Sequence, residues 1–250
     1  MRAREQRPHR ATILPETGNL QPGSASIHNP TYWWYRVRSD LMALVFAEHI
    51  AEGARVIDVG SADGPSAAWI DELADRISVD VDPRGLRRGG ICASGDRLPL
   101  PDAGADGVAA FDVIEHFQDE SAIVRELARV LRPGGVLLAS VPAYQWAWSG
   151  FDVKAGHYRR YTRRRFRALL QAQGFAIRRT TYAFGATFPL FAIDRLRARL
   201  LRRGEERVAE SKISPTAERL LIGLSGLDRR LLPQHDLPFG SSVFAVATKP

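Results

Sequence analysis

Cysteine and long apolar runs are scarce in this chain of 250 residues. Cys92 is the one cysteine, so the sequence has no disulfide framework and a reducing, cytoplasmic compartment is expected. No uncharged apolar run approaches the roughly 20 residues that span a bilayer, and the basic N-terminus lacks the apolar segment of a signal peptide. We therefore expect neither a secreted disulfide scaffold nor an integral membrane protein, and a location at the inner face of the membrane stays open.

Lysine is also scarce, because three of the 35 basic residues are lysine and the rest are arginine. The formal net charge is +7. This balance permits nucleic acid, anionic lipid or a phosphorylated substrate as a partner and selects none of them. With 45% apolar residues, the length fits one domain with a sizeable core.

The composition changes sharply near residue 28. Residues 1–27 are polar and rich in arginine, proline and glycine, which predicts a flexible leader. Residues 28–250 are predicted to form a single domain. Four aromatic residues follow one another at 32–35, so they cannot share one face of a helix. We expect some of them to pack inward and others to cover a ligand, ahead of a helix over 38–51.

A strand, a small-residue loop and a helix follow one another at 55–75. Residues 55–59 are expected to form a buried parallel strand, because three of them, Val56, Ile57 and Val59, are apolar and β-branched. The loop 60–64 leads into a helix expected over 65–75, with Pro65 in its first turn. Such a unit presents backbone N–H groups at the carboxyl end of a strand, where open α/β sheets bind nucleotide-like ligands.

Further strand and helix patterns alternate after this unit. Strands are expected over 77–81, 90–94, 106–111 and 136–141, and helices over 84–89 and 120–131. Five such alternations predict a doubly wound sheet. Asp80 lies about 20 residues past Gly60, where a carboxylate accepts hydrogen bonds from both hydroxyls of a ribose. Asp96 lies in a turn-rich loop and is placed to meet a base edge.

The second half is less regular. Its expected elements are an aromatic turn region over 142–156, a helix over 163–173, a strand over 175–184, two or three helices in an insert over 186–232 and a terminal strand over 240–248. Thr162 suits the N-cap of the helix 163–173, and Gly174 suits the position after its end.

The stretch Asp58-Val59-Gly60-Ser61-Ala62-Asp63-Gly64 resembles the first motif of class I S-adenosylmethionine-dependent methyltransferases. The family pattern is an acidic residue followed by Gly-x-Gly-x-Gly, and here Ala62 replaces the middle glycine. The spacing of the motifs makes the likeness specific over roughly residues 50–142. The other matching positions are Asp80, Gly95-Asp96, Leu98-Pro99, Asp112-Val113-Ile114-Glu115-His116 and Leu131-Arg132-Pro133-Gly134-Gly135. A dinucleotide site would use a similar loop, but the motifs of strands four and five match methyltransferases better.

The resemblance implies an α/β, Rossmann-like, doubly wound sheet of seven strands in the order 3-2-1-4-5-7-6, with the last strand antiparallel. An N-terminal helical lid and the helical insert 186–232, between strands six and seven, would complete the domain. The implied cofactor is S-adenosyl-L-methionine. The predicted cofactor site comprises Asp58, Gly60, Ser61, Ala62, Gly64, Asp80, Val81, Asp96, Arg97 and Asp112.

The family's roles transfer to these positions. The small residues of the loop 60–64 let the backbone approach the methionine part and the ribose of the cofactor. Asp58 and Asp112 are assigned to its methionine end, and Asp80 to its ribose hydroxyls. Asp96 is matched to the adenine amino group, with a backbone contact from Arg97. No metal ion is expected.

The flanks resemble small bacterial methyltransferases of the type-11/type-23 group, many of which belong to cell-envelope, glycolipid or secondary-metabolite pathways. This likeness rests on the aromatic segment, on residues 156–162 and on residues 237–242. The candidate substrate-binding residues are Tyr32, Trp33, Trp34, Tyr144, Tyr158, Arg159 and Arg160. The aromatic residues at 32–35 form either a lid that favours the sulfonium or a latch that seals the first helix onto the sheet. Arg159 and Arg160 are candidates for binding an acidic or phosphorylated substrate.

Two histidines are candidates for proton transfer. His157 is the better candidate base, because a neutral imidazole there can take a proton from a hydroxyl; the alternative is a histidine hydrogen-bonded within its loop. His116 is the weaker candidate, and its alternative is a structural role at the next helix. The insert 186–232 combines leucine with arginine, so it can lie on an anionic membrane, pack on the domain, or join a homodimer.

These patterns predict methyl transfer to a small-molecule, lipid-linked or glycosylated acceptor, with oxygen as the preferred acceptor atom. A nucleic-acid methyltransferase is the rival suggested by the basic charge. Two absences argue against it: no Asn/Asp-Pro-Pro-aromatic motif follows strand four, and Cys92 is too far from the site for a nucleophile. A non-catalytic cofactor-binding scaffold is the third alternative.

Overall fold

A computed structural model describes residues 32–83, 86, 89–200 and 214–250. The predicted leader 1–27 and most of the helix expected over 84–89 lie outside the described residues. A seven-stranded sheet forms the centre, in the order β3-β2-β1-β4-β5-β7-β6. Its strands are β1 (Arg55–Val59), β2 (Asp75–Asp80), β3 (Ile91–Cys92), β4 (Ala105–Phe111), β5 (Leu131–Pro142), β6 (Ala176–Ala183) and β7 (Ser242–Thr248). The order confirms the predicted fold, and β7 is antiparallel to both β5 and β6.

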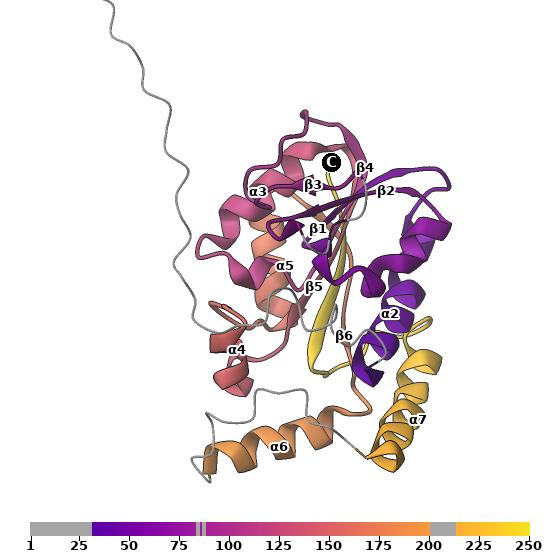
Figure 1. Cartoon of the computed structure of the whole chain (residues 1–250), viewed down its shortest axis with the longest axis vertical. Helices are drawn as coiled ribbons and strands as arrows, with labels where there is room; N and C mark the ends of the chain where they lie inside the picture. The colour runs from indigo at the N-terminus through magenta and orange to yellow at the C-terminus, as the bar shows by residue number, and fades with distance from the viewer. Residues whose placement is uncertain (1–31, 84–85, 87–88, 201–213) are drawn as a thin grey trace, which may run out of the picture.

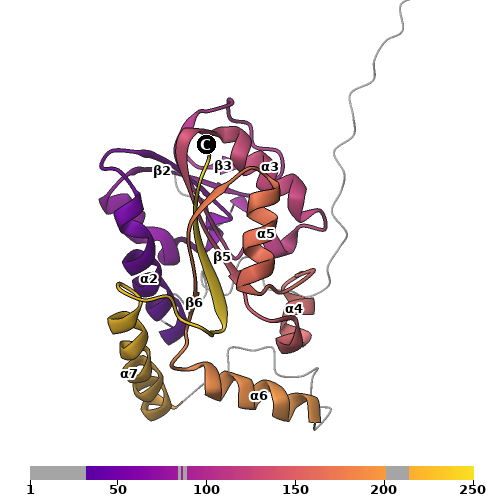
Figure 2. The same ribbon diagram turned by 180° about the vertical axis from the view of Figure 1, so that it is seen from behind.

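Helices cover both faces of the sheet (Figures 1 and 2). α2 (Trp33–Phe46) and α7 (Pro215–Leu231) lie on one face, and α3 (Glu120–Val130) and α5 (Arg163–Ala172) lie on the other. Shorter turns connect these layers. They are the 3-10 segments η1 (Ala47–His49), η2 (Ser61–Glu72), η4 (Ile114–His116) and η5 (Gln145–Ala147), and the short helix α4 (Gly150–Lys154).

α3 shows how local sequence produces these layers. Asp119 caps the helix by accepting backbone N–H groups at Ser121 and Ala122. The apolar residues then recur at helical spacing and are buried against the sheet: Ile123, Val124, Leu127 and Val130. Burial of each such side chain contributes about 1.5–3 kcal/mol. Glu126 and Arg129 remain on the outer face, where they form an ion pair.

Several boundaries differ from the prediction. The first helix starts at Trp33, so three of the four consecutive aromatic residues are helical. The helix expected over 65–75 is instead the 3-10 segment η2, which begins directly after Gly60. β5 begins at Leu131, because this residue, expected as the end of the helix 120–131, pairs with Ala105 at the start of β4; the register then shifts before Val136 pairs with Gly107.

The insert contains α6 (Phe188–Leu200) and α7. α7 is anchored to the end of β6, because the buried Asp228 accepts the backbone N–H of Gly185 at 2.9 Å. Arg229 and Asp40 link α7 to α2. Both views place α6 apart from these layers, beyond the end of the sheet that also carries α4. Within the described segments, no helix is both long and apolar enough to cross a bilayer.

Candidate active site

The parallel strands β1, β2, β4 and β5 all end at one edge of the sheet, here called the carboxyl edge. Because β7 runs in the opposite direction, the C-terminus marks the other edge (Figure 1). The order 2-1-4 makes the gap between β1 and β4 the topological switch point, since their following connections leave toward opposite faces. Ligands of such sheets bind at this point.

Gly60 forms the turn at the end of β1. Its φ of 75° is left-handed, and a Cβ placed there would lie 2.2 Å from Cγ2 of Val113. Both observations require glycine at this position. The backbone therefore passes close to the segment after β4, and Val113 occupies the space that a side chain at residue 60 would need.

The end of β2 presents an acidic and an apolar side chain together. Asp80 is half-buried, and its Oδ1 accepts the backbone N–H of Asp82 at 2.8 Å. Val81 beside it is 61% exposed, which is unusual for valine at the end of a central strand. A carboxylate next to an open apolar side chain fits a ribose and the base attached to it.

The loop after β3 carries the residues assigned to the adenine ring. Asp96 is half-buried and accepts the hydroxyl hydrogen of Ser94. Arg97 is exposed, and its backbone N–H donates to the carbonyl of Ser94 at 3.0 Å. This turn holds Asp96 near the carboxyl edge. That position is compatible with contact to the adenine amino group, which stays a prediction.

The two acids assigned to the methionine end already have protein partners. Asp58 is buried, and its Oδ2 lies 2.9 Å from Nη1 of Arg76, whose side chain is also buried. Asp112 accepts a hydrogen bond from Ser140 at 3.0 Å and pairs with Arg38 at 2.9 Å. Asp112 also has a φ of 55°, so the backbone turns sharply directly after β4. Contact of either acid with an ammonium group stays a prediction.

The aromatic residues before β1 divide between the core and the rim. Trp33 is buried in the core, so it seals the first helix onto the sheet, as the latch alternative predicts, and does not line a substrate site. Tyr32 and Trp34 are half-buried, and Trp34 stacks on Phe184 with ring centroids 5.7 Å apart. After β5, Tyr144 stacks on Tyr182 with centroids 5.2 Å apart.

Arg160 does not have the substrate-binding role that the sequence suggested. Its guanidinium is buried, its Nε donates to Oδ1 of Asp152 at 2.7 Å, and its Nη1 donates to the carbonyl of Ala143. The neighbouring Arg159 donates to the carbonyl of Gln118 at 2.7 Å and pairs with Glu120. Tyr158 lies beside Arg159. Of the candidates Tyr158, Arg159 and Arg160, it is the one with a solvent-exposed side chain.

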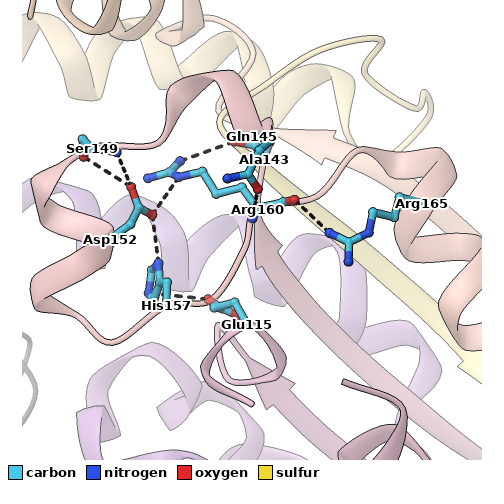
Figure 3. A network of polar contacts seen from close by, with 8 residues as sticks. All are labelled: Glu115, Ala143, Gln145, Ser149, Asp152, His157, Arg160 and Arg165. Carbon is cyan, nitrogen blue, oxygen red and sulfur yellow. Dashed lines mark hydrogen bonds and ion pairs between the residues drawn. The ribbon is translucent and has the colours of Figure 1, made fainter. Parts of the chain in front are cut away.

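His157 lies at the centre of a polar network, shown in Figure 3. Its Nδ1 is 2.9 Å from Oδ1 of Asp152, and its side chain is 8% exposed. Burial opposes ionisation of Asp152, but the hydrogen bond from His157 and the charge of Arg160 outweigh it and lower the pKa of Asp152 to about 2. The ionised Asp152 therefore accepts Nδ1–H, which leaves Nε2 of His157 as the nitrogen with a lone pair.

Glu115 faces His157 from the other side. The backbone N–H of Tyr158 donates to the Glu115 carbonyl at 2.8 Å, which joins the loop after α4 to η4. The Glu115 side chain is fully buried, and burial together with Asp112 raises the pKa of its carboxyl well above the ordinary value. His116 lies next to it, with its ring edge-on to that of His157 at 4.7 Å between centroids. His116 keeps an exposed surface, but desolvation by the surrounding atoms and the nearby His157 lower its pKa to about 4.

Asp152 is not among the predicted site residues, and Glu115 has no predicted role. A signal for Asp152 exists, since Ser149 and Asp152 have the spacing of a capping box. The structure contains that box: the backbone N–H of Ser149 donates to Oδ2 of Asp152 at 2.8 Å. No local pattern reveals that Glu115 is buried, because the loop after α4 covers it.

Comparisons with known proteins agree with this geometry. The sequence model of the methyltransferase-domain family 23 matches residues 33–180. A protein of Mycolicibacterium smegmatis, described as an S-adenosylmethionine-dependent methyltransferase, is 34% identical over 189 residues, which are 69% of this chain and 70% of the relative.

Two solved structures share the fold. An S-adenosylmethionine-dependent methyltransferase from Thermotoga maritima has a TM-score of 0.56 at 16% identity, over 88% of this chain and 91% of that chain. Phosphoethanolamine N-methyltransferase 2 of Haemonchus contortus, in complex with S-adenosyl-L-methionine, has a TM-score of 0.55 at 15% identity, over 90% of this chain and 57% of that chain. The turn at Gly60 and the open Val81 beside Asp80 fit that cofactor. The chain belongs to the methyltransferase-domain family and is a class I S-adenosylmethionine-dependent methyltransferase.

Proposed function

We propose that this methyltransferase methylates a hydroxyl oxygen of a small-molecule, lipid-linked or glycosylated acceptor. The bound cofactor supplies a methyl group that its sulfonium activates. The observation that carries the proposal is His157, whose Nδ1 is held by Asp152 and whose Nε2 is directed toward the Glu115 side of the carboxyl edge. Hydroxyl acceptors lose a proton on methylation, and an oriented neutral imidazole is suited to take it.

The chain's own groups divide this task. The ionised Asp152 fixes the imidazole and stabilises it once it is protonated. The loop at Gly60 and the acid Asp80 hold the cofactor at the switch point, so that the acceptor must approach from the side of η4 and α4. Alignment of the acceptor there contributes to the rate by proximity.

α6 supports a lipid-linked acceptor. It lies beyond the carboxyl edge, and Arg199 ties it to the carbonyl of Trp146 at 3.2 Å. Phe188 packs inward against Tyr144, with ring centroids 5.3 Å apart. The opposite side of the helix exposes apolar side chains at helical spacing, namely Leu190, Ile193, Leu196 and Leu200. An outward apolar stripe beside exposed arginines has the character of a helix that lies in an anionic membrane surface.

The test uses labelled cofactor and the full chain. S-adenosyl-L-methionine with a ¹⁴C-methyl group is incubated with lipid and aqueous extracts, and labelled products are identified by mass spectrometry. We expect a lipid-phase product with an O-methyl group. His157→Ala is expected to lower its turnover at least about 100-fold, with cofactor affinity unchanged by calorimetry; the control is His235→Ala, which changes an exposed histidine. An N-methyl or C-methyl product contradicts the acceptor atom, and unchanged turnover contradicts the role of His157.

A further inference from the structure

Three metal-ligating side chains meet at the carboxyl edge. Glu115 and His116 are neighbours in η4, and His157 comes from the loop after α4. One ligand atom of each residue lies within 4.8 Å of the other two. The hydrogen bond from the Tyr158 N–H to the Glu115 carbonyl holds the two segments in this register.

Glu115 is the observation that points to a ligand. Its side chain is fully buried, and within the described part of the chain neither carboxylate oxygen accepts a hydrogen bond. Nε2 of His157 is 4.0 Å from Oε1 and so too distant for a hydrogen bond. A buried carboxyl group without partners is costly, and a bound cation would remove that cost.

His157 is also oriented as a ligand. Its Nδ1 is bound to the carboxylate of Asp152 at 2.9 Å, and its Nε2 is directed at Glu115. A carboxylate that accepts the second ring N–H is the usual partner of a metal-bound histidine, because it fixes the tautomer and the ring plane. His116 supplies the second imidazole of the cluster, with its ring centroid 4.7 Å from that of His157.

We propose that Glu115, His116 and His157 bind a divalent transition-metal cation of the Zn²⁺, Co²⁺ or Mn²⁺ class. Two imidazoles and one carboxylate select this class over Ca²⁺ and Mg²⁺, which prefer oxygen ligands. Ligand atoms around such a cation are about 2.0–2.2 Å from it, so the side chains close in by about 1 Å on binding. Three protein ligands leave further coordination positions open.

The open positions give the cation a task at the same edge. An acceptor hydroxyl bound there would release its proton to water more readily, because a cation lowers the pKa of oxygen that it binds. His157 would then act on the acceptor through the cation and not directly. This task rests on the proposed function, whereas cation binding itself does not.

The test is titration of chelator-treated, full-length protein with Zn²⁺ by calorimetry and with Co²⁺ by visible absorption. We expect one cation per chain and Co²⁺ ligand-field bands. Glu115→Gln and His157→Gln should each weaken binding at least tenfold, and His235→Ala should leave it unchanged. Glu115→Gln preserves the shape of a buried neutral carboxyl group, so it is the variant that separates loss of a ligand from loss of the fold; circular dichroism checks this.

Two results overturn the proposal: no stoichiometric binding by the unaltered chain, or binding that both site variants retain. Neither result affects the proposed function, because His157 then keeps its direct role as base. Stoichiometric binding without any O-methyl product has the opposite meaning, since the cation site stands and the acceptor assignment fails.

Discussion

Two segments at the carboxyl edge each bury one carboxyl group. The two groups are equally buried but differ in their hydrogen-bond partners and in the direction of their pKa shifts. In α4, Asp152 accepts hydrogen bonds from Ser149, His157 and Arg160. In η4, Glu115 accepts none within the described part of the chain. The pKa of Asp152 is lowered to about 2, and that of Glu115 is raised. Since both side chains have no exposed area, burial alone does not set the charge of a carboxyl group.

The difference separates two tasks. Asp152 is satisfied by the protein, so its carboxylate fixes the positions of Arg160 and His157. Glu115 is not satisfied by the protein, so its carboxyl group is available to something else. A satisfied buried charge belongs to the framework of the site, whereas an unsatisfied one marks the place where a ligand is expected.

The largest expected effect comes from removing the satisfied carboxylate. Asp152→Ala leaves the buried Arg160 without its charge partner, and breaking a buried ion pair in this way costs about 3–5 kcal/mol. Urea unfolding followed by circular dichroism measures this loss. Asp152→Asn is the matched control, because it keeps the size of the side chain and one of the two acceptor oxygens while it removes the charge, so it should cost less. A loss for the alanine variant of less than about 1 kcal/mol would place the pair among weak surface interactions.

Features set by local sequence patterns could be predicted, whereas contacts that depend on the tertiary fold could not. The strand and the turn at Gly60 and the position of Asp80 follow from local patterns, and the resemblance carried by the motif spacing led to the correct strand order. The pairing of Arg160 with Asp152 is different, because it depends on how the irregular segment after α4 turns back on that helix, which no repeating pattern indicates. Arginine in a basic run predicts a solvent-exposed or substrate-facing side chain, and only the tertiary fold shows the opposite.

Trp33 and α6 show the same limit for apolar residues. A run of aromatic residues predicts that some are buried without showing which, and the start of α2 at Trp33 directs that ring into the core. The apolar spacing of α6 predicts an amphipathic helix. It does not show which apolar positions face outward, and the structure exposes Ile193 and Leu196.

A smaller effect, of opposite sign, is expected from the unsatisfied carboxyl group. In the folded chain the pKa of Glu115 is raised above its value in the unfolded chain, so its contribution to stability is present below about pH 4.5 and is lost as the pH rises. Glu115→Gln removes this loss. We expect the chelator-treated variant to be more stable than the unaltered chain between pH 5 and pH 8.

Urea unfolding at a series of pH values measures this gain, and Glu126→Gln is the control. Glu126 is paired with Arg129 on the outer face of α3, and hydrogen bonds from Arg129 lower its pKa. Its replacement should therefore cost stability in the same pH range, where the Glu115 variant gains it. The opposite result is a Glu115→Gln variant that becomes less stable than the unaltered chain as the pH rises. It would mean that the Glu115 carboxyl group is ionised and has hydrogen-bond partners, as Asp152 has.

The smallest effect tests how the satisfied carboxylate is held. Ser149→Ala removes the side-chain hydrogen bond of 3.3 Å to Oδ2 of Asp152 but keeps the backbone N–H bond of 2.8 Å, so we expect a loss of about 0.5–1 kcal/mol. Asp152 has a lower pKa in the folded chain, so its contribution is full above about pH 4 and is lost as the pH falls toward 2. With one donor fewer, the pKa of Asp152 in the folded chain rises toward its unfolded value, so its contribution to stability is smaller and the acid-unfolding midpoint should move to a higher pH. Acid unfolding followed by tryptophan fluorescence measures the midpoint, and an unchanged midpoint would mean that Arg160, His157 and the backbone of Ser149 suffice to keep Asp152 ionised.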